Sequence, residues 1–243
     1  MKKFLVITSV VSAFLLAFGV WNIQRTSTLD DRRNINEAAQ YTPNKPDVVK
    51  TTSVLLNVPF TSQAPRANWS DPRQQDGCEE ASIYMAYLWA TNGSTTPEEA
   101  EKTITAISDF EEFHYGNFHD TNAADTVKVM KAYFNYQNVS FTMNPTIENI
   151  KNELRQGRLV LVPANGQKLN NPNFKPPGPV THMLVIRGFD DASGKFTTND
   201  PGTRLGEGYI YDYSTVYDAM VDYPTGTHES QEGRPKSMIV VSK

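Results

Sequence analysis

The order of apolar and polar positions divides the chain into three parts. Residues 4–21 form an apolar stretch without a charged side chain, and Lys2 and Lys3 precede it. Residues 22–52 are polar and predict a linker or strap that buries little surface. From residue 53 to residue 243, apolar positions recur at regular spacing, which predicts one folded domain.

Within this domain, helix-like patterns come first and strand-like patterns follow. The expected helices span residues 78–91, 96–108, 122–138 and 146–156. The expected strands span residues 54–60, 159–164, 182–189, 195–199, 208–211 and 237–241. Because the two kinds of element are segregated along the chain, the pattern predicts an α+β fold rather than alternating βαβ units.

The first 21 residues have the pattern of a signal peptide or an N-terminal membrane anchor. The 18 residues from 4 to 21 would span about 27 Å as a helix, close to the roughly 30 Å of a hydrocarbon core. Ala17-Phe18-Gly19 offers a cleavage site with small residues. We therefore expect an exported protein, secreted or membrane-anchored at the cell surface, in which residues 22–52 are a candidate pro-segment.

The composition argues against several classes of function and of site. The 243 residues carry a formal net charge of −4, and no run of Lys or Arg is present, which argues against nucleic-acid binding. A single cysteine excludes an intrachain disulfide and Cys-rich zinc sites. No glycine-rich phosphate loop is present, and we expect no cofactor.

The single cysteine, Cys78, follows an Asp76-Gly77 turn and opens the helix expected over residues 78–91. Unpaired backbone N–H groups and the helix dipole lower the pKa of a thiol at this position. Glu79 and Glu80 act in the opposite direction, so a cation must come from elsewhere in the fold. A lone cysteine is also consistent with a small buried apolar residue.

A hairpin is expected to bring a histidine and an aspartate together. The strand at 182–189 begins with His182, a turn occupies 191–194, and the strand at 195–199 is followed by Asp200. In a hairpin, the start of the first strand lies beside the end of the second, so His182 and Asp200 are expected neighbours. A histidine that opens a core strand is also common as a structural residue. Gln63 lies upstream, where its amide could reach the region of Cys78.

Taken in order, these motifs resemble a known family. Gln63, the stretches 76–79 and 181–185, and Asn199-Asp200-Pro201-Gly202-Thr203 are similar to the stand-alone branch of papain-like cysteine peptidases. This branch is related to the bacterial bacteriocin-processing, double-glycine leader peptidases of cysteine-peptidase family thirty-nine. The resemblance covers roughly residues 57–241. It implies a papain-like fold in which an N-terminal helix with the cysteine packs on an antiparallel sheet that carries the histidine and the aspartate.

The resemblance also implies a role for each site residue. Cys78 would be the nucleophile, His182 the base, Asp200 the orienting acid and Gln63 an oxyanion donor. Asn199 stays open as the third member, because papain itself uses an amide there. The better-known processing enzymes are fused to exporters, and this sequence has no transporter segment.

The sequence therefore predicts an exported or membrane-tethered cysteine peptidase or amidase that acts on a peptide or protein substrate. The alternative is a catalytically silent module of the same fold that binds peptide or cell-wall material. A third interpretation is thioester chemistry that transfers an acyl group instead of hydrolysing it. Residues 4–21 are the expected membrane tether, and no nucleic-acid partner is expected.

Two further groups of residues are candidates for binding. His114, His119, Asp120 and Asp125 could bind a metal, but their spacing fits no pair on one helix face, and Asp120 or Thr121 could simply cap the next helix. We expect no metal site. The candidates for lining a substrate cleft are Trp69, Tyr115, Phe118 and the loop at residues 170–179.

Overall fold

The computed structural model describes residues 51–228 and 231–243. The predicted signal or anchor segment at residues 1–21, and the predicted linker up to residue 50, lie outside the described residues. The first strand of the described chain begins at Ser53. No helix within the described part of the chain has the length and apolar character to cross a membrane.

Most of the helices in the described chain lie in the first half of the domain. The helices are α1 (Pro72–Gln75), α2 (Cys78–Thr91), α3 (Pro97–Tyr115), α4 (Ala123–Tyr133), α5 (Ile147–Arg155) and α6 (Tyr213–Ala219). The bounds of α2 are those predicted, and α2 is buried on nearly all sides because apolar or small residues surround its axis. The start of α3 has a capping box between Thr96 and Glu99, with proline in the first turn.

One antiparallel sheet is built from the strands of the described chain. The strands are β1 (Ser53–Leu55), β2 (Val139–Met143), β3 (Leu159–Ala164), β4 (His182–Asp190), β5 (Lys195–Asn199), β6 (Glu207–Asp212) and β7 (Ser237–Val241). The strand order is β2-β7-β3-β4-β5-β6, and β1 pairs with β4. The predicted α+β class, with an antiparallel sheet, is therefore confirmed.

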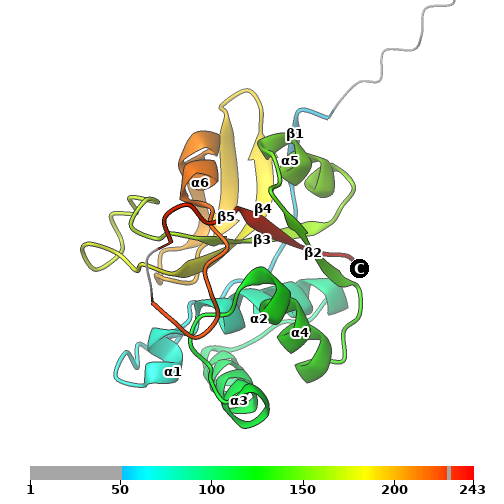
Figure 1. Ribbon diagram of the computed structural model, residues 1–243. Helices are drawn as coiled ribbons and strands as arrows, with labels where there is room; N and C mark the ends of the chain where they lie inside the picture. The colour runs from blue at the N-terminus through cyan, green and yellow to red at the C-terminus, as the bar shows by residue number, and fades with distance from the viewer. Residues whose placement is uncertain (1–50, 229–230) are drawn as a thin grey trace, which may run out of the picture. The chain divides into compact units, whose positions relative to one another are not determined.

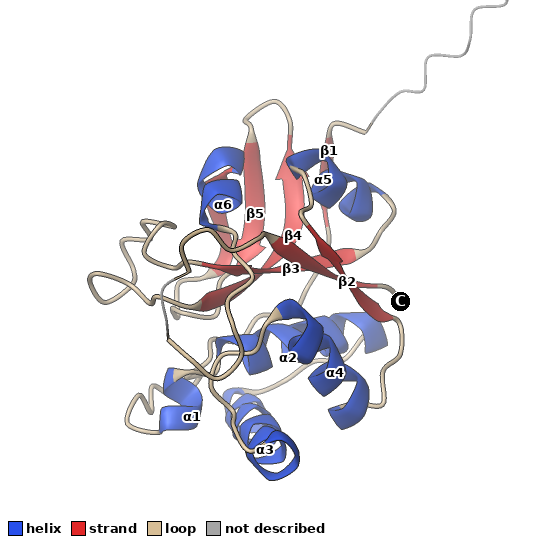
Figure 2. Cartoon of the chain, in the orientation of Figure 1, coloured by secondary structure: helices blue, strands red, loops and turns tan. Residues whose placement is uncertain are grey.

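The sheet has helices on both faces, as Figures 1 and 2 show. Alternate residues of β3 separate the two cores. Leu159 and Leu161 pack with α2 and α4, whereas Val160 and Val162 pack with α5 and α6. Since both faces are covered, β3 is a continuous apolar run instead of an alternating one. Cys78 belongs to the core on the α2 side.

Several predicted boundaries are wrong. The first strand ends at Leu55 and does not reach residue 60, because the following segment leaves the sheet and offers the Val58 and Pro59 carbonyls to the Asn199 side chain. The helix predicted to end at residue 108 continues to Tyr115, where a left-handed Gly116 ends it.

Other differences concern elements that depend on distant partners. The helix predicted over 122–138 ends at Tyr133, shortly before Asn135 adopts a positive φ. Its cap is Asn122, not Asp120 or Thr121. The sequence analysis did not identify α1, α6 or β2. Strand β2 pairs with β7 near the C-terminus, and its residues alternate between apolar and polar, as Val139-Ser140-Phe141-Thr142-Met143.

Candidate active site

Cys78 is the first residue of α2, and Gly77 precedes it as the helix cap. A Cβ on Gly77 would lie 2.6 Å from the carbonyl oxygen of Arg73, so only glycine allows α1 to approach α2 this closely. The Cys78 side chain is 5% exposed and lines a pocket of about 810 Å³. The turn before the helix therefore delivers the thiol to the pocket wall.

His182 and Asp200 are brought together by the β4–β5 hairpin. The strands pair from Asp190 opposite Lys195 to Val185 opposite Asn199, and Asp200 follows directly. His182 Nε2 lies 2.8 Å from Asp200 Oδ1, as the hairpin predicts. Both side chains are almost fully buried.

The Asp200 carboxylate receives hydrogen bonds on both oxygens. The Gly202 N–H also donates to Oδ1, at 3.1 Å. Tyr211 Oη donates to Oδ2 at 2.6 Å, and Asn171 Nδ2 donates to Oδ2 at 3.2 Å. Burial alone would raise the pKa of Asp200, but His182 and these donors hold it below the usual value. The structure therefore presents an ionised aspartate to the imidazole.

The Asn199 side chain, the other candidate for the third catalytic residue, makes its hydrogen bonds to backbone groups. Its Nδ2 donates to the carbonyl oxygens of Val58 and Pro59, and its Oδ1 accepts from the Gly208 N–H. Asn199 thus ties the segment after β1 to the β5–β6 hairpin. Asp200 is the residue that contacts His182.

Gln63 lies on the same pocket as Cys78 and beside the turn that precedes it. Its backbone N–H donates to the Pro201 carbonyl oxygen at 2.9 Å. Its Nε2 donates to the carbonyl oxygens of Gln75 at 2.7 Å and Gln74 at 3.1 Å. Gln63 therefore connects the turn after β5, through its backbone N–H, to α1, through its side-chain amide. Both hydrogens of the side-chain amide point at backbone carbonyls.

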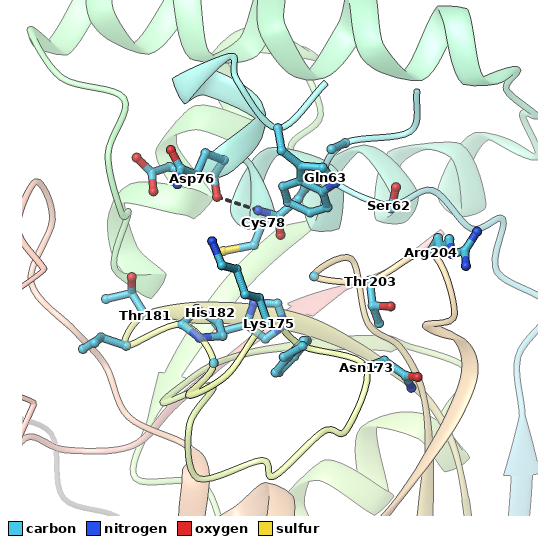
Figure 3. Close-up of a pocket in the computed structure, with 18 of the residues that line it drawn as sticks. Ser62, Gln63, Asp76, Cys78, Asn173, Lys175, Thr181, His182, Thr203 and Arg204 are labelled. Atoms are coloured by element: carbon cyan, nitrogen blue, oxygen red, sulfur yellow. Dashed lines mark hydrogen bonds between the residues drawn. The ribbon is translucent and has the colours of Figure 1, made fainter. Parts of the chain in front are cut away.

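Figure 3 shows how the predicted residues share the pocket. Cys78 and Gln63 lie on the side formed by α1 and α2, and His182 lies on the opposite side, at the start of β4. Trp69 and the loop at residues 173–179 complete the wall, as predicted for them. Tyr115 and Phe118 are not among the residues that line it.

The thiol of Cys78 is in an acidic environment. Its Sγ donates a hydrogen bond of 2.9 Å to Glu79 Oε2. Burial, and then the Glu79 carboxyl, raise the pKa of the thiol well above its usual value, and Asp120 and Glu80 add to this. The pKa of the thiol is therefore raised and not lowered as the helix start predicts, because burial and the nearby acids favour the neutral form.

A second group of acids and histidines lies at the edge of the pocket. His228 Nδ1 is 2.8 Å from Asp120 Oδ2, and Asp76 lies 3.4 Å from His119 Nε2 and 3.7 Å from His228 Nε2. The predicted candidates His114 and Asp125 are not part of this group. Within residues 51–228 and 231–243, no three His, Cys, Asp or Glu side chains are arranged to hold a metal ion.

Comparison with known proteins agrees with this geometry. The model of the Peptidase_C39 like family matches residues 55–225, which is most of the described domain. The chain belongs to this family. A C39-like peptidase is a papain-like hydrolase, so a peptide is the substrate class that family membership implies. No curated protein matches the chain.

A solved structure shows the same fold. It is a Bacillus anthracis protein described as a "putative C39-like peptidase", with a TM-score of 0.52 and 16% sequence identity. The match covers 79% of this chain and 99% of that chain. At this identity the likeness concerns the fold of the C39-like domain.

Two residues that bind Asp200, and one that binds the neighbour of Cys78, were not predicted from the sequence. Tyr211 and Asn171 bind Asp200, and Tyr223 binds Glu79. The alternation of Tyr209, Ile210 and Tyr211 fits ordinary strand patterning, which gave no sign that Tyr211 points at a carboxylate. The polar loop around Asn171 did suggest a binding wall, but not a partner.

Proposed function

We propose that this C39-like protein is an exported cysteine peptidase or amidase that uses Cys78 as nucleophile, His182 as base and Asp200 as orienting acid. The observation that carries the proposal is the buried His182–Asp200 pair, of which His182 lines the same pocket as the chain's only thiol. Export rests on the apolar stretch at residues 4–21. Accessibility of the domain to a protease added to intact cells tests it.

The reaction would begin with transfer of the Cys78 proton to His182. His182 Nε2 is occupied by Asp200, which leaves Nδ1 as the ring nitrogen for this exchange. The thiolate attacks the carbonyl carbon of the substrate, and Asp200 stabilises the imidazolium that forms. His182 then donates the proton to the leaving amine, and water hydrolyses the thioester.

The oxyanion would be bound by the backbone N–H of Cys78 and by Gln63. A residue at the first position of a helix has no intrahelical acceptor for its N–H, so this donor is available. Gln63 Nε2 must turn one hydrogen away from a carbonyl, and the longer bond, to Gln74, is the weaker of the two. A single oxyanion donor contributes about 3 kcal/mol to transition-state stabilisation in other hydrolases.

One observation favours the silent binding module as a second candidate. The Cys78 thiol is buried and donates to Glu79, which is not the arrangement of a preformed thiolate–imidazolium pair. A module of this kind would bind peptide in the pocket without cleaving it. Turnover separates the two candidates.

Hydrolysis of a peptide library by the wild type, Cys78→Ala and His182→Ala tests the proposal. We expect cleavage by the wild type and a loss of at least about a thousandfold in each variant, because either change removes a member of the catalytic unit. Circular dichroism should show intact folds. Full activity in either variant contradicts the assignment. Binding without cleavage by the wild type supports the silent module, and product formed only with added amines supports transfer.

A further inference from the structure

Glu79 follows Cys78 in α2, and its carboxyl group is enclosed in the domain. The side chain is 2% exposed. Glu79 Oε2 accepts the hydrogen bond from the Cys78 thiol at 2.9 Å, and Oε1 accepts one from Tyr223 Oη at 2.5 Å. The thiol, the carboxyl and the phenol thus form one buried chain of hydrogen bonds. The proposed reaction uses neither the carboxyl nor the phenol.

A buried carboxyl group at this position has a free-energy cost. Burying a carboxylate without a cation costs several kcal/mol, and burial does raise the pKa of Glu79 well above its usual value. Among the residues that the structure describes, no Lys or Arg forms an ion pair with it. A glutamine has a single acceptor oxygen, so in place of this carboxyl it could accept from the thiol or from the phenol but not from both. What only the glutamate supplies is an acceptor oxygen for each of the two donors, the thiol and the phenol.

We infer that Glu79 is a positioning residue that holds the Cys78 thiol protonated and directed at its carboxyl until substrate enters the pocket. Tyr223, from the segment before β7, fixes the carboxyl by donating to its other oxygen. When substrate is bound, the S–H proton passes to His182, and Glu79 keeps its own protonation state. This inference rests on the proposed function, because it assigns Glu79 to the proposed nucleophile.

Other titratable groups near Cys78 also influence the pKa of its thiol. Glu80 on α2 and Asp120 from the α3–α4 connection also raise the pKa of Cys78. Tyr223 is itself buried, and burial followed by Glu79 raises the pKa of its phenol. The further titratable or charged side chains that line the pocket are Asp76, Lys175, His182, Arg204 and His228. Removing Glu79 alone leaves all of these in place.

The pH dependence of thiolate formation tests the inference directly. Because the chain has one cysteine, thiolate absorbance and alkylation by uncharged iodoacetamide both report Cys78 alone. We expect the midpoint in Glu79→Gln to fall by about one pH unit or more, which means roughly tenfold more thiolate at a given pH below it. The control is Glu112→Gln, an exposed glutamate on α3, which should leave the midpoint unchanged.

An unchanged midpoint in folded Glu79→Gln overturns the inference. If this variant does not fold, Glu79→Asp takes its place, since the shorter side chain withdraws the carboxyl from Cys78 Sγ and should also lower the midpoint. An unchanged midpoint in folded Glu79→Asp also overturns the inference. Cys78-dependent hydrolysis with an unshifted midpoint rejects only the role of Glu79. Cys78-independent hydrolysis rejects the proposed function, whatever the midpoint does.

Discussion

At the scale of single residues, the protein keeps one carboxylate charged and another group neutral within the same buried region. Asp200 is ionised because His182, Tyr211 and a backbone N–H all donate to it. Cys78 is held neutral because it is buried and because its thiol donates to the Glu79 carboxyl. Burial is common to both sites, so hydrogen-bond partners decide the difference.

Tyr211→Phe removes a donor from Asp200 without changing the shape of the side chain. The pKa of Asp200 should rise, so the acid limb of the rate profile should move to higher pH. We expect kcat/KM to fall about tenfold, equivalent to roughly 1.4 kcal/mol of weaker imidazole orientation. Peptide hydrolysis measured across pH checks this. The control is Tyr209→Phe, since the Tyr209 ring packs 4.7 Å from that of Tyr211, whereas its hydroxyl does not bind Asp200. An equal loss in both variants would contradict the prediction.

At the scale of elements, the turn between β5 and β6 holds Asp200 in place. The Asp200 N–H donates to the Gly206 carbonyl oxygen at 2.9 Å, and the Gly206 N–H donates to Thr203 at 3.2 Å. The same turn carries the Pro201 carbonyl that binds the Gln63 backbone. One short loop therefore positions residues on both sides of the pocket.

Gly206→Ala should disrupt this turn. A Cβ at this position would lie 1.8 Å from the carbonyl oxygen of Asp200, so the backbone itself must move. We expect a loss of about 1–3 kcal/mol in the free energy of unfolding, together with lower peptidase activity. Leu205→Ala, at an exposed neighbour, should change stability by less than about 0.5 kcal/mol. Denaturant unfolding measures both variants, and a wild-type midpoint for Gly206→Ala would contradict the prediction.

At the scale of the whole molecule, stability depends on acids buried between α2 and α3. Glu80 and Glu111 are both about 1% exposed, and Ser108 Oγ donates to Glu80 at 3.0 Å. Burial raises the pKa of Glu111 to about 8, with a smaller contribution from Glu79, while a hydrogen bond with Glu80 acts in the opposite direction. The unfolded chain releases this proton near its ordinary value of 4.5, so the folded state retains it through the interval between the two.

The contribution of Glu111 to the free energy of unfolding should therefore be greatest below about pH 4.5 and fall as the pH rises to about 8. The slope contributed by Glu111 is at most about 1.4 kcal/mol per pH unit. Glu111→Gln should flatten this slope, so its advantage over the wild type should grow as pH increases. Glu112→Gln, at the exposed neighbour, should retain the wild-type slope. Unfolding measured from pH 5 to 8 checks this, and parallel slopes for wild type and Glu111→Gln would contradict it.

Predictability from the sequence follows the distance between interacting residues. Helix α2 and strands β3, β5 and β7 have the predicted bounds, because local apolar patterns and turn residues specify them. The contact between His182 and Asp200 was predictable because a hairpin joins residues only 18 apart. Strand β2 was not predicted, although its apolar and polar residues alternate, and the helix expected directly before β2 was extended to residue 138 instead of ending at Tyr133.

The sequence by itself determined where the thiol, the imidazole and the carboxylate lie relative to local elements. This is because neighbouring residues specify turns and the ends of strands. Only the tertiary structure decided their protonation. Tyr223 meets Glu79 across 144 residues, and both enclose a sulfur that the helix start alone would leave more acidic. The charge of a buried group depends on every atom that excludes water from it, and those atoms come from the whole chain.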